Sequence, residues 1–136
     1  MLLSEKKQKC SSPDDVFKII NSILDSEGEG ARLQEHFYVI GLNNRNVIQF
    51  IELVSLGTIS ETIVHPREVF RTLIMKSCSS FIVVHNHPSG DCTPSEEDKN
   101  TTQRLVDSGI LLGIVILDHI IIGNCYFSLK EAGYIK

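Results

Sequence analysis

The sequence predicts an α/β protein in which a mixed β-sheet is flanked by helices. Its elements follow the order helix, hairpin, helix, strand, helix and further strands, which alternates helical with extended periodicity. The chain has 136 residues, of which 42% are hydrophobic and 22% charged, so it can form one ordinary core and is too apolar to be disordered. We therefore expect a single domain over residues 12–136, preceded by a polar, flexible tail over residues 1–11.

The first helix is predicted to begin at Ser12, because that serine can cap it, the next residue is a proline, and two aspartates follow. Apolar residues then recur at helical spacing until the glycine-bearing segment 26–30 ends the helix. Two runs of β-branched and aromatic residues, 36–42 and 47–57, are separated by the turn-forming residues 43–46. These two runs predict a β-hairpin.

The second half alternates helices with strands. A second helix is predicted to begin at Pro66, and the compact apolar run 80–86 is typical of a strand buried in the middle of a sheet. A loop rich in proline and glycine leads to a third helix from Ser95 to about Ser108. The apolar run 110–123 is too long for one strand, so we expect two strands there, and a last helical turn near the C-terminus.

Composition excludes several function classes. The net charge of −4 gives no basic face, which argues against binding to a nucleic-acid backbone by charge alone. No apolar run is long enough to cross a bilayer and no secretory leader is evident, so we expect a cytoplasmic protein that does not bind membranes. The cysteines form no C-x-x-C pair and are expected to be reduced thiols: Cys10, Cys78, Cys92 and Cys125.

The most unusual segment, 85–98, reads HNHPSGDCTPSEED. His85 and His87 stand two residues apart at the end of a predicted strand, so both rings point to the same side. If the following loop folds back, Asp98 in the first turn of the next helix can join them. Two histidines and one aspartate make a three-ligand zinc site with its fourth position open for water, as in catalytic zinc sites. Asp91 is a rival ligand, but it lies in a glycine-bearing loop with less positional control.

Ser95 and Asp98 also fit a second interpretation. Ser-x-x-Asp at a helix start is the pattern of an N-terminal cap, which Asp98 would merely complete. The histidines upstream favour the metal site, because strand, loop and helix start then converge on one point. The remaining histidines are expected to be structural or surface groups: His36, His65 and His119.

Water on a zinc ion needs a base to take its proton and pass it to a leaving group. No glutamate adjoins the histidines, so the base must come from elsewhere in the chain. Glu35 stands just before the first strand of the hairpin, where a carboxylate at a strand edge could reach a neighbouring strand's end. Spacing alone does not separate it from its competitors, which are Glu52, Glu61 and Glu68.

The pattern His85-x-His87-Pro88, six residues, Ser95, two residues, Asp98, with a glutamate upstream, resembles the JAMM (MPN+) metalloprotease motif. The sequence is more similar still to the bacterial RadC family, whose members carry a JAMM-like domain. The resemblance spans about 100 of the 136 residues. The segments that carry it are EHFYVIGLNNRN at 35–46, GTISETIVHPREVF at 57–70, HNHPSGDCTPSEED at 85–98, LLGIVILDHIIIG at 111–123 and SLKEAGY at 128–134.

The resemblance implies a cytidine-deaminase-like three-layer fold, in line with the order of elements above. It also implies one zinc ion per chain, held by His85, His87 and Asp98. Glu35 matches the general acid/base of the JAMM motif. Ser95 matches the serine that steadies the oxyanion as water adds to a carbonyl.

These observations favour a zinc-dependent hydrolase that cleaves a peptide or isopeptide bond in a peptide or protein substrate. A non-enzymatic interaction module of a DNA-repair-associated protein and a metal-dependent nuclease are the alternatives, and the acidic balance weighs against the nuclease. Longer RadC-type chains carry a helix-hairpin-helix region ahead of this domain. Residues 1–34 are too short and too acidic to supply one, so we expect no DNA binding by this domain alone.

Overall fold

A computed structural model describes residues 2–4, 8–57 and 64–136, and a single six-stranded sheet runs through this part of the chain. The strands are β1 (Leu2–Ser4), β2 (Glu35–Leu42), β3 (Ile48–Gly57), β4 (Ser80–Asn86), β5 (Val115–Ile122) and β6 (Tyr126–Ser128). The helices are α1 (Pro13–Ser26), a 3₁₀ turn η1 (Ala31–Leu33), α2 (Pro66–Met75) and α3 (Glu96–Leu112). The strand order is β1-β3-β2-β4-β5-β6, and only the β4–β5 pair is parallel. The predicted mixed α/β sheet is confirmed.

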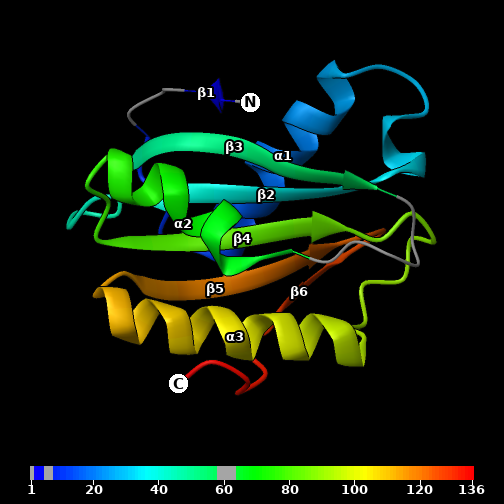
Figure 1. Cartoon of the computed structure of the whole chain (residues 1–136). Helices are drawn as coiled ribbons and strands as arrows, with labels where there is room; N and C mark the ends of the chain where they lie inside the picture. The colour runs from blue at the N-terminus through cyan, green and yellow to red at the C-terminus, as the bar shows by residue number, and fades with distance from the viewer. Residues whose placement is uncertain (1, 5–7, 58–63) are drawn as a thin grey trace.

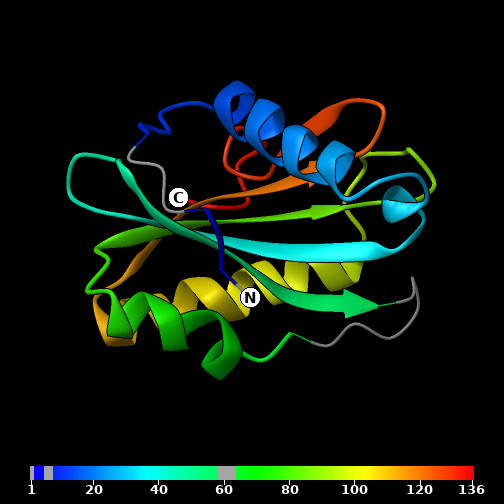
Figure 2. The same cartoon turned by 90° about the horizontal axis from the view of Figure 1, so that it is seen from above.

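The sheet lies between two helical layers, with α1 on one face and α2 and α3 on the other (Figures 1 and 2). Alternate residues of each strand enter opposite cores. Phe81 and Val83 of β4 pack in the core beside α2 and α3, whereas Ile82 and Val84 pack in the core beside α1. His85 continues the series of Phe81 and Val83, so the same alternation turns its ring toward the layer of α3.

Strand β4 occupies the middle of the sheet, as predicted. All of its residues are buried, and it pairs with β2 on one side and with β5 on the other. Its register places His85 opposite Phe37 of β2 and Ile121 of β5. The chain leaves the C-terminal end of β4 and enters α3 at the same end of the molecule (Figure 1). Side chains from the end of β4 and the start of α3 can therefore meet.

Helix α3 is longer than predicted, and this corrects the expectation of two strands within 110–123. The helix continues to Leu112 and ends at Gly113, whose φ of +73° is the left-handed conformation that favours glycine at a helix end. Ile110 and Leu111 are exposed on its last turn, so their apolar character does not mark a buried strand. Within 110–123 the structure therefore has one strand, β5, rather than two. No helix in the described ranges is both long and apolar enough to span a membrane.

Part of the N-terminal segment pairs with the sheet. Strand β1 pairs antiparallel with the outer edge of β3, Lys9 forms a bridge with Val47, and Cys10 is buried. An uncovered β3 edge would leave a row of backbone groups without protein partners, and β1 supplies such partners. The described residues of this segment thus pair with the sheet, while the flexible tail over 1–11 stays a prediction.

The C-terminal segment differs from the predicted helical turn at its first residue. Ser128 ends strand β6, where its hydroxyl donates to the carboxylate of Asp118 at 2.6 Å. The turn begins only after this strand, and it is closed by a hydrogen bond from the Tyr134 N–H to the Leu129 carbonyl at 2.9 Å. Pairing with the buried Asp118 keeps Ser128 in the sheet.

Candidate metal centre

Three side chains converge where β4 ends and α3 begins. His85 is the last residue but one of β4, His87 follows the strand directly, and Asp98 is the third residue of α3. His85 Nε2 is 3.0 Å from Asp98 Oδ1, and His87 Nε2 is 3.1 Å from Asp98 Oδ2. The two Nε2 atoms are 3.1 Å apart. The structure thus brings together the three residues that the sequence indicated, as a group that could hold a metal ion.

The hydrogen bond of His87 suits metal ligation. Its Nδ1 lies 2.8 Å from the backbone carbonyl of Asp91, which can only accept, so Nδ1 carries the hydrogen. In the neutral ring, Nε2 then has a free lone pair and points at the carboxylate of Asp98. An unprotonated nitrogen facing a carboxylate oxygen is a repulsive arrangement that a cation between them relieves. The donor set therefore fits a metal ion.

The pKa shifts of Asp98 and His87 also show that the cluster favours a positive charge beside the Asp98 carboxylate. Burial by itself would raise the pKa of Asp98, but the contacts of its carboxylate with His85 and His87 outweigh burial and hold that pKa well below its usual range. The side-chain hydrogen bond with Asp98 raises the pKa of His87, against the effect of burial. Without a metal ion, this pair favours a carboxylate beside a protonated imidazole. A metal ion must displace that proton in order to bind.

Ser95 and Asp98 close the N-terminus of α3 and belong to the cluster at the same time. The Ser95 N–H donates to Asp98 Oδ2 at 2.8 Å, and the Asp98 N–H donates to Ser95 Oγ at 3.1 Å. The capping interpretation and the cluster therefore coexist. Because Ser95 Oγ accepts in this cap, its own hydrogen stays available, and the residue is exposed.

Glu35 lies beside the three ligands. It is the first residue of β2, and its Oε1 is 3.9 Å from His85 Nε2. Burial raises the pKa of Glu35; the neighbouring His85 and His87 offset part of this rise, and Asp98 adds to it. A carboxyl group with a raised pKa next to a group of metal-ligating side chains has the properties of a general base and acid.

The other candidate carboxylates have different places. Glu52 lies within β3, opposite Val39. Glu68 accepts from the His65 N–H at 3.4 Å and thereby caps α2. Glu61 is outside the described residues. Asp91, the rival ligand, is exposed, and its carboxylate accepts from the Thr93 N–H at 3.0 Å.

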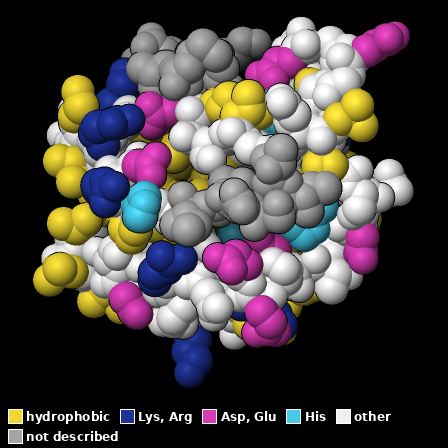
Figure 3. All heavy atoms as spheres, turned by 45° about the vertical axis from the view of Figure 1, so that its right-hand side comes forward, with side chains coloured by type: hydrophobic (Ala, Val, Ile, Leu, Met, Phe, Trp, Pro, Cys, Tyr) yellow, Lys and Arg dark blue, Asp and Glu magenta, His cyan; other side chains and the backbone are white. Residues whose placement is uncertain are grey.

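Histidine and acidic side chains lie close together on the surface at this end of the molecule (Figure 3). Two of the histidines expected to be structural lie apart from the cluster: His36 contacts Glu27, and His65 precedes α2. The third, His119, is fully buried and lies 2.8 Å from Nδ1 of His85. His119 is a structural histidine as expected, but its partner is a candidate ligand. Sequence reasoning missed this contact, because it depends on the register between β4 and β5.

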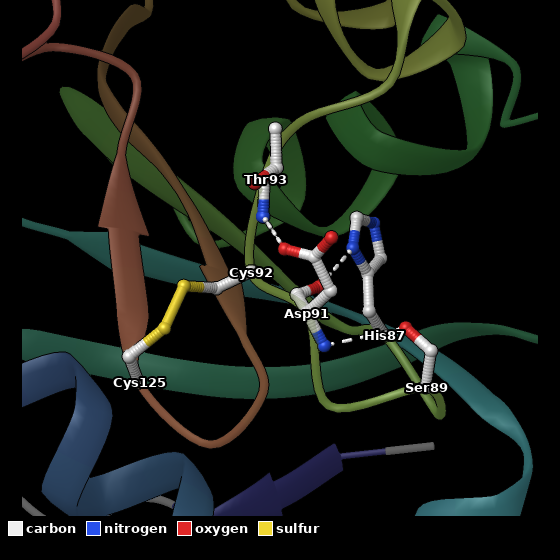
Figure 4. The surroundings of a disulfide bond; sticks show 6 residues. All are labelled: His87, Ser89, Asp91, Cys92, Thr93 and Cys125. Atoms are coloured by element: carbon white, nitrogen blue, oxygen red, sulfur yellow. Dashed lines mark hydrogen bonds between the residues drawn. A yellow bond between two sulfur atoms is a disulfide. The ribbon is translucent and has the colours of Figure 1, made fainter.

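A disulfide joins Cys92 to Cys125 next to the cluster, which corrects the expectation of four reduced thiols (Figure 4). Cys92 lies in the loop between β4 and α3, and Cys125 in the turn before β6. The two segments touch: the Asn124 N–H donates to the Gly90 carbonyl at 2.8 Å, and a Cβ added at Gly123 would lie 2.2 Å from that carbonyl oxygen. This close approach brings the two Cα atoms to 6.1 Å, within reach of a disulfide. The remaining cysteines, Cys10 and Cys78, are free and buried.

Comparison with known proteins places these residues in a family. The family model described as RadC-like JAB domain matches residues 10–134, which include the whole cluster. A UPF0758 protein of Methanosarcina mazei is 47% identical over 135 residues, covering 98% of this chain and 57% of that protein. A UPF0758 protein of Staphylococcus epidermidis is 50% identical over 130 residues, covering 94% of this chain and 55% of that protein.

The chain thus spans little more than half the length of these relatives. The match begins at residue 10, ahead of α1, and extends to residue 134, so its range includes every element that builds the site. A JAB-type domain is compatible with a metal-dependent hydrolase, and the cluster of two histidines and an aspartate fits such a domain. On the strength of this match, the chain belongs to the RadC family.

Proposed function

We propose that this chain is a zinc-dependent hydrolase that cleaves a peptide or isopeptide bond. The observation that carries the proposal is the position of the Glu35 carboxylate, 3.9 Å from a ligand atom of the His-His-Asp cluster, together with its raised pKa. A hydrolytic metal site needs such a group within reach of the attacking water. A cluster that only stabilised the fold would have no use for it.

The ligand set is one that zinc uses. Two imidazole nitrogens and one carboxylate oxygen form the type of three-ligand set that catalytic zinc sites use, with one position left for water or substrate. The ligand atoms lie 3.0 to 3.1 Å apart, close enough to share one small ion. When bound, zinc would polarise the substrate carbonyl and lower the pKa of water.

Glu35 and Ser95 have complementary roles in this proposal. The carboxylate of Glu35 takes the proton of the attacking water. Its raised pKa lets it return that proton to the departing amine, which an amide bond requires and an ester does not. The hydroxyl hydrogen of Ser95, which the cap leaves unused, donates to the oxygen of the carbonyl as negative charge develops there.

The test compares Glu35→Gln with Glu97→Gln, a matched control that removes the same charge from an exposed residue at the start of α3. Zinc content is measured by mass spectrometry, and turnover with peptide and isopeptide-linked substrates. We expect about one zinc ion per chain in all three proteins. Turnover should fall by about 10²–10⁴-fold in Glu35→Gln alone.

Unchanged turnover in Glu35→Gln would remove its role as base. A zinc-loaded wild type that cleaves none of the substrates would favour an interaction module instead. Plasmid cleavage that is lost in His87→Ala would favour a nuclease.

A further inference from the structure

A line of hydrogen bonds runs behind His85, on the side away from the metal ligands. His85 Nδ1 is 2.8 Å from His119 Nε2, and His119 Nδ1 is 2.6 Å from Thr102 Oγ1. Thr102 Oγ1 is in turn 2.7 Å from the backbone carbonyl of Asp98. The line joins β4, β5 and α3. It begins at His85 and ends at Asp98, and both of these residues are candidate metal ligands. The proposed hydrolysis assigns no role to Thr102 or His119.

The contact at the Asp98 carbonyl sets the direction of every hydrogen in this line. Two oxygen atoms 2.7 Å apart need a hydrogen between them, and the hydroxyl of Thr102 holds the only one available. Once that hydroxyl donates to the carbonyl, Thr102 Oγ1 can only accept, so His119 carries its hydrogen on Nδ1. The Nε2 of His119 then presents a lone pair, to which His85 donates from its own Nδ1.

This direction of hydrogen bonds determines the state of His85 Nε2, the atom that faces Asp98. A neutral imidazole with its hydrogen on Nδ1 has a free lone pair on Nε2, which is the form that binds a metal ion. The reverse order of hydrogens would put the hydrogen on Nε2 of His85. That order suits a metal-free contact with Asp98, but it leaves Thr102 Oγ1 and the Asp98 carbonyl facing each other with no hydrogen between them.

The side chain of His119 is fully buried. The ring of Phe37 stacks on His85 with centroids 5.9 Å apart and meets His119 edge-on at 6.0 Å. One apolar side chain therefore packs against both imidazoles and restricts their movement.

We propose that Thr102 and His119 are positioning residues that hold His85 in the tautomer and orientation required of a metal ligand. The inference rests on the proposed metal site. It adds that Asp98 fixes the site twice, since its carboxylate faces His85 Nε2 while its backbone carbonyl anchors the far end of the line. Partners of this kind commonly change metal affinity by about 10–100-fold.

The main experiment measures zinc affinity by competition with a chelator. His119→Leu removes the acceptor, and Thr102→Val removes the anchor while keeping the shape of the side chain. We expect zinc to bind about 10–100-fold more weakly in His119→Leu, and about 10-fold more weakly in Thr102→Val. Thr102→Ser, which keeps the hydroxyl, should restore the wild-type affinity. Thr72→Val is the matched control, because Thr72 is a buried threonine of α2 outside the line.

A second measurement keeps the test valid if His119→Leu does not fold. Nitrogen-15 NMR of the histidines in the metal-free protein reports which ring nitrogen carries the hydrogen. We expect His85 to carry it on Nδ1 in wild type and in Thr102→Ser, and to lose this preference in Thr102→Val. Wild-type zinc affinity in Thr102→Val, or a metal-free wild type with the hydrogen of His85 on Nε2, would overturn the proposal.

The outcomes separate the two proposals. A wild type that binds no zinc would overturn the proposed function, and the NMR result would then decide on the line of hydrogen bonds by itself. A wild type that binds zinc, with variants that bind it equally well, would leave the hydrolase standing and overturn the positioning role.

Discussion

Helices α1 and α3 begin with the same local motif, Ser-x-x-Asp. In α1 the Asp15 N–H donates to Ser12 Oγ at 3.2 Å, and in α3 the Asp98 N–H donates to Ser95 Oγ at 3.1 Å. Each aspartate also accepts a backbone N–H just ahead of its helix, Asp15 from Ser11 at 3.1 Å and Asp98 from Ser95 at 2.8 Å. As helix caps, the two ends are almost the same.

The difference lies in what the rest of the fold brings to each cap. Asp15 hydrogen-bonds with Ser11 and Ser12 beside it, and the backbone hydrogen bond of Ser11 lowers the pKa of Asp15. Asp98 meets two imidazoles at the end of a buried strand. Capping and metal binding are thus not exclusive readings of Ser-x-x-Asp, because one carboxylate has enough lone pairs for both.

The largest expected effect comes from replacing each aspartate by asparagine. Asp98→Asn should weaken zinc binding by more than about 100-fold, because it removes the charged ligand itself rather than a neighbour of one. Asp15→Asn should leave zinc binding unchanged. Both variants should remain folded, since an asparagine side chain still accepts in a cap. Chelator competition and thermal unfolding measure the two quantities, and full zinc affinity in Asp98→Asn would remove it from the ligand set.

The serines of the two caps sharpen the comparison. Ser12→Ala and Ser95→Ala should each lower the free energy of unfolding by about 0.5–2 kcal/mol, because each loses a cap. Only Ser95→Ala should also lower kcat, by about 10²–10³-fold, through loss of the donor to the oxyanion. Urea unfolding and steady-state turnover give both values. If Ser95→Ala lost stability alone, the serine would be a cap and nothing more.

The disulfide tests whether the loop ahead of α3 must be held. Cys92→Ser should lower the free energy of unfolding by about 2–4 kcal/mol, as for other cross-links of this kind. Zinc affinity should fall as well, because the adjacent Asp91 supplies the carbonyl that orients His87 (Figure 4). The double variant with Cys125→Ser serves as the control. Because Cys92→Ser already removes the bond, the second substitution should lower neither stability nor zinc affinity any further. A further loss of stability in the double variant would contradict the assignment of the effect to the disulfide.

The smallest expected effect is a pH dependence of the metal-free protein. Because the folded-state pKa of His87 is raised, its pairing with Asp98 stabilises the fold fully below about pH 6.5, the ordinary histidine value, and this contribution is lost as pH rises through the raised pKa. We therefore expect Tm to fall by a few degrees on the alkaline side. Zinc affinity should rise over the same window, because the competing proton leaves His87.

Calorimetry of metal-free wild type and His87→Gln measures this effect. The alkaline fall in Tm should be absent in His87→Gln and unchanged in Asp15→Asn. An equal fall in His87→Gln would assign the pH dependence to other groups.

Local patterns were enough to predict part of the site. Period-two alternation places His85 and His87 on one side of a strand, and a helix start places Asp98 after the loop, so these three needed no knowledge of the sheet. The contact between His85 and His119, 34 residues apart in sequence, depends on the register between β4 and β5, which no local pattern encodes. The disulfide likewise depends on how two loops meet. The extension of α3 to Leu112 was missed for another reason, because exposed apolar residues imitate a strand.

Because β4 lies in the middle of the sheet, His85 and His87 are held by segments that we expect to open at different rates. Backbone amides in a strand that is paired on both sides usually exchange with solvent only when the whole fold opens. His85 belongs to that strand. His87 lies beyond it, at the start of the loop that leads to α3, where its N–H reaches the Ile122 carbonyl at 2.8 Å. Release of an ion held at this site would therefore need only the loop to move if it began at His87, a loop that the Cys92–Cys125 bond restrains, but would need the sheet to open if it began at His85.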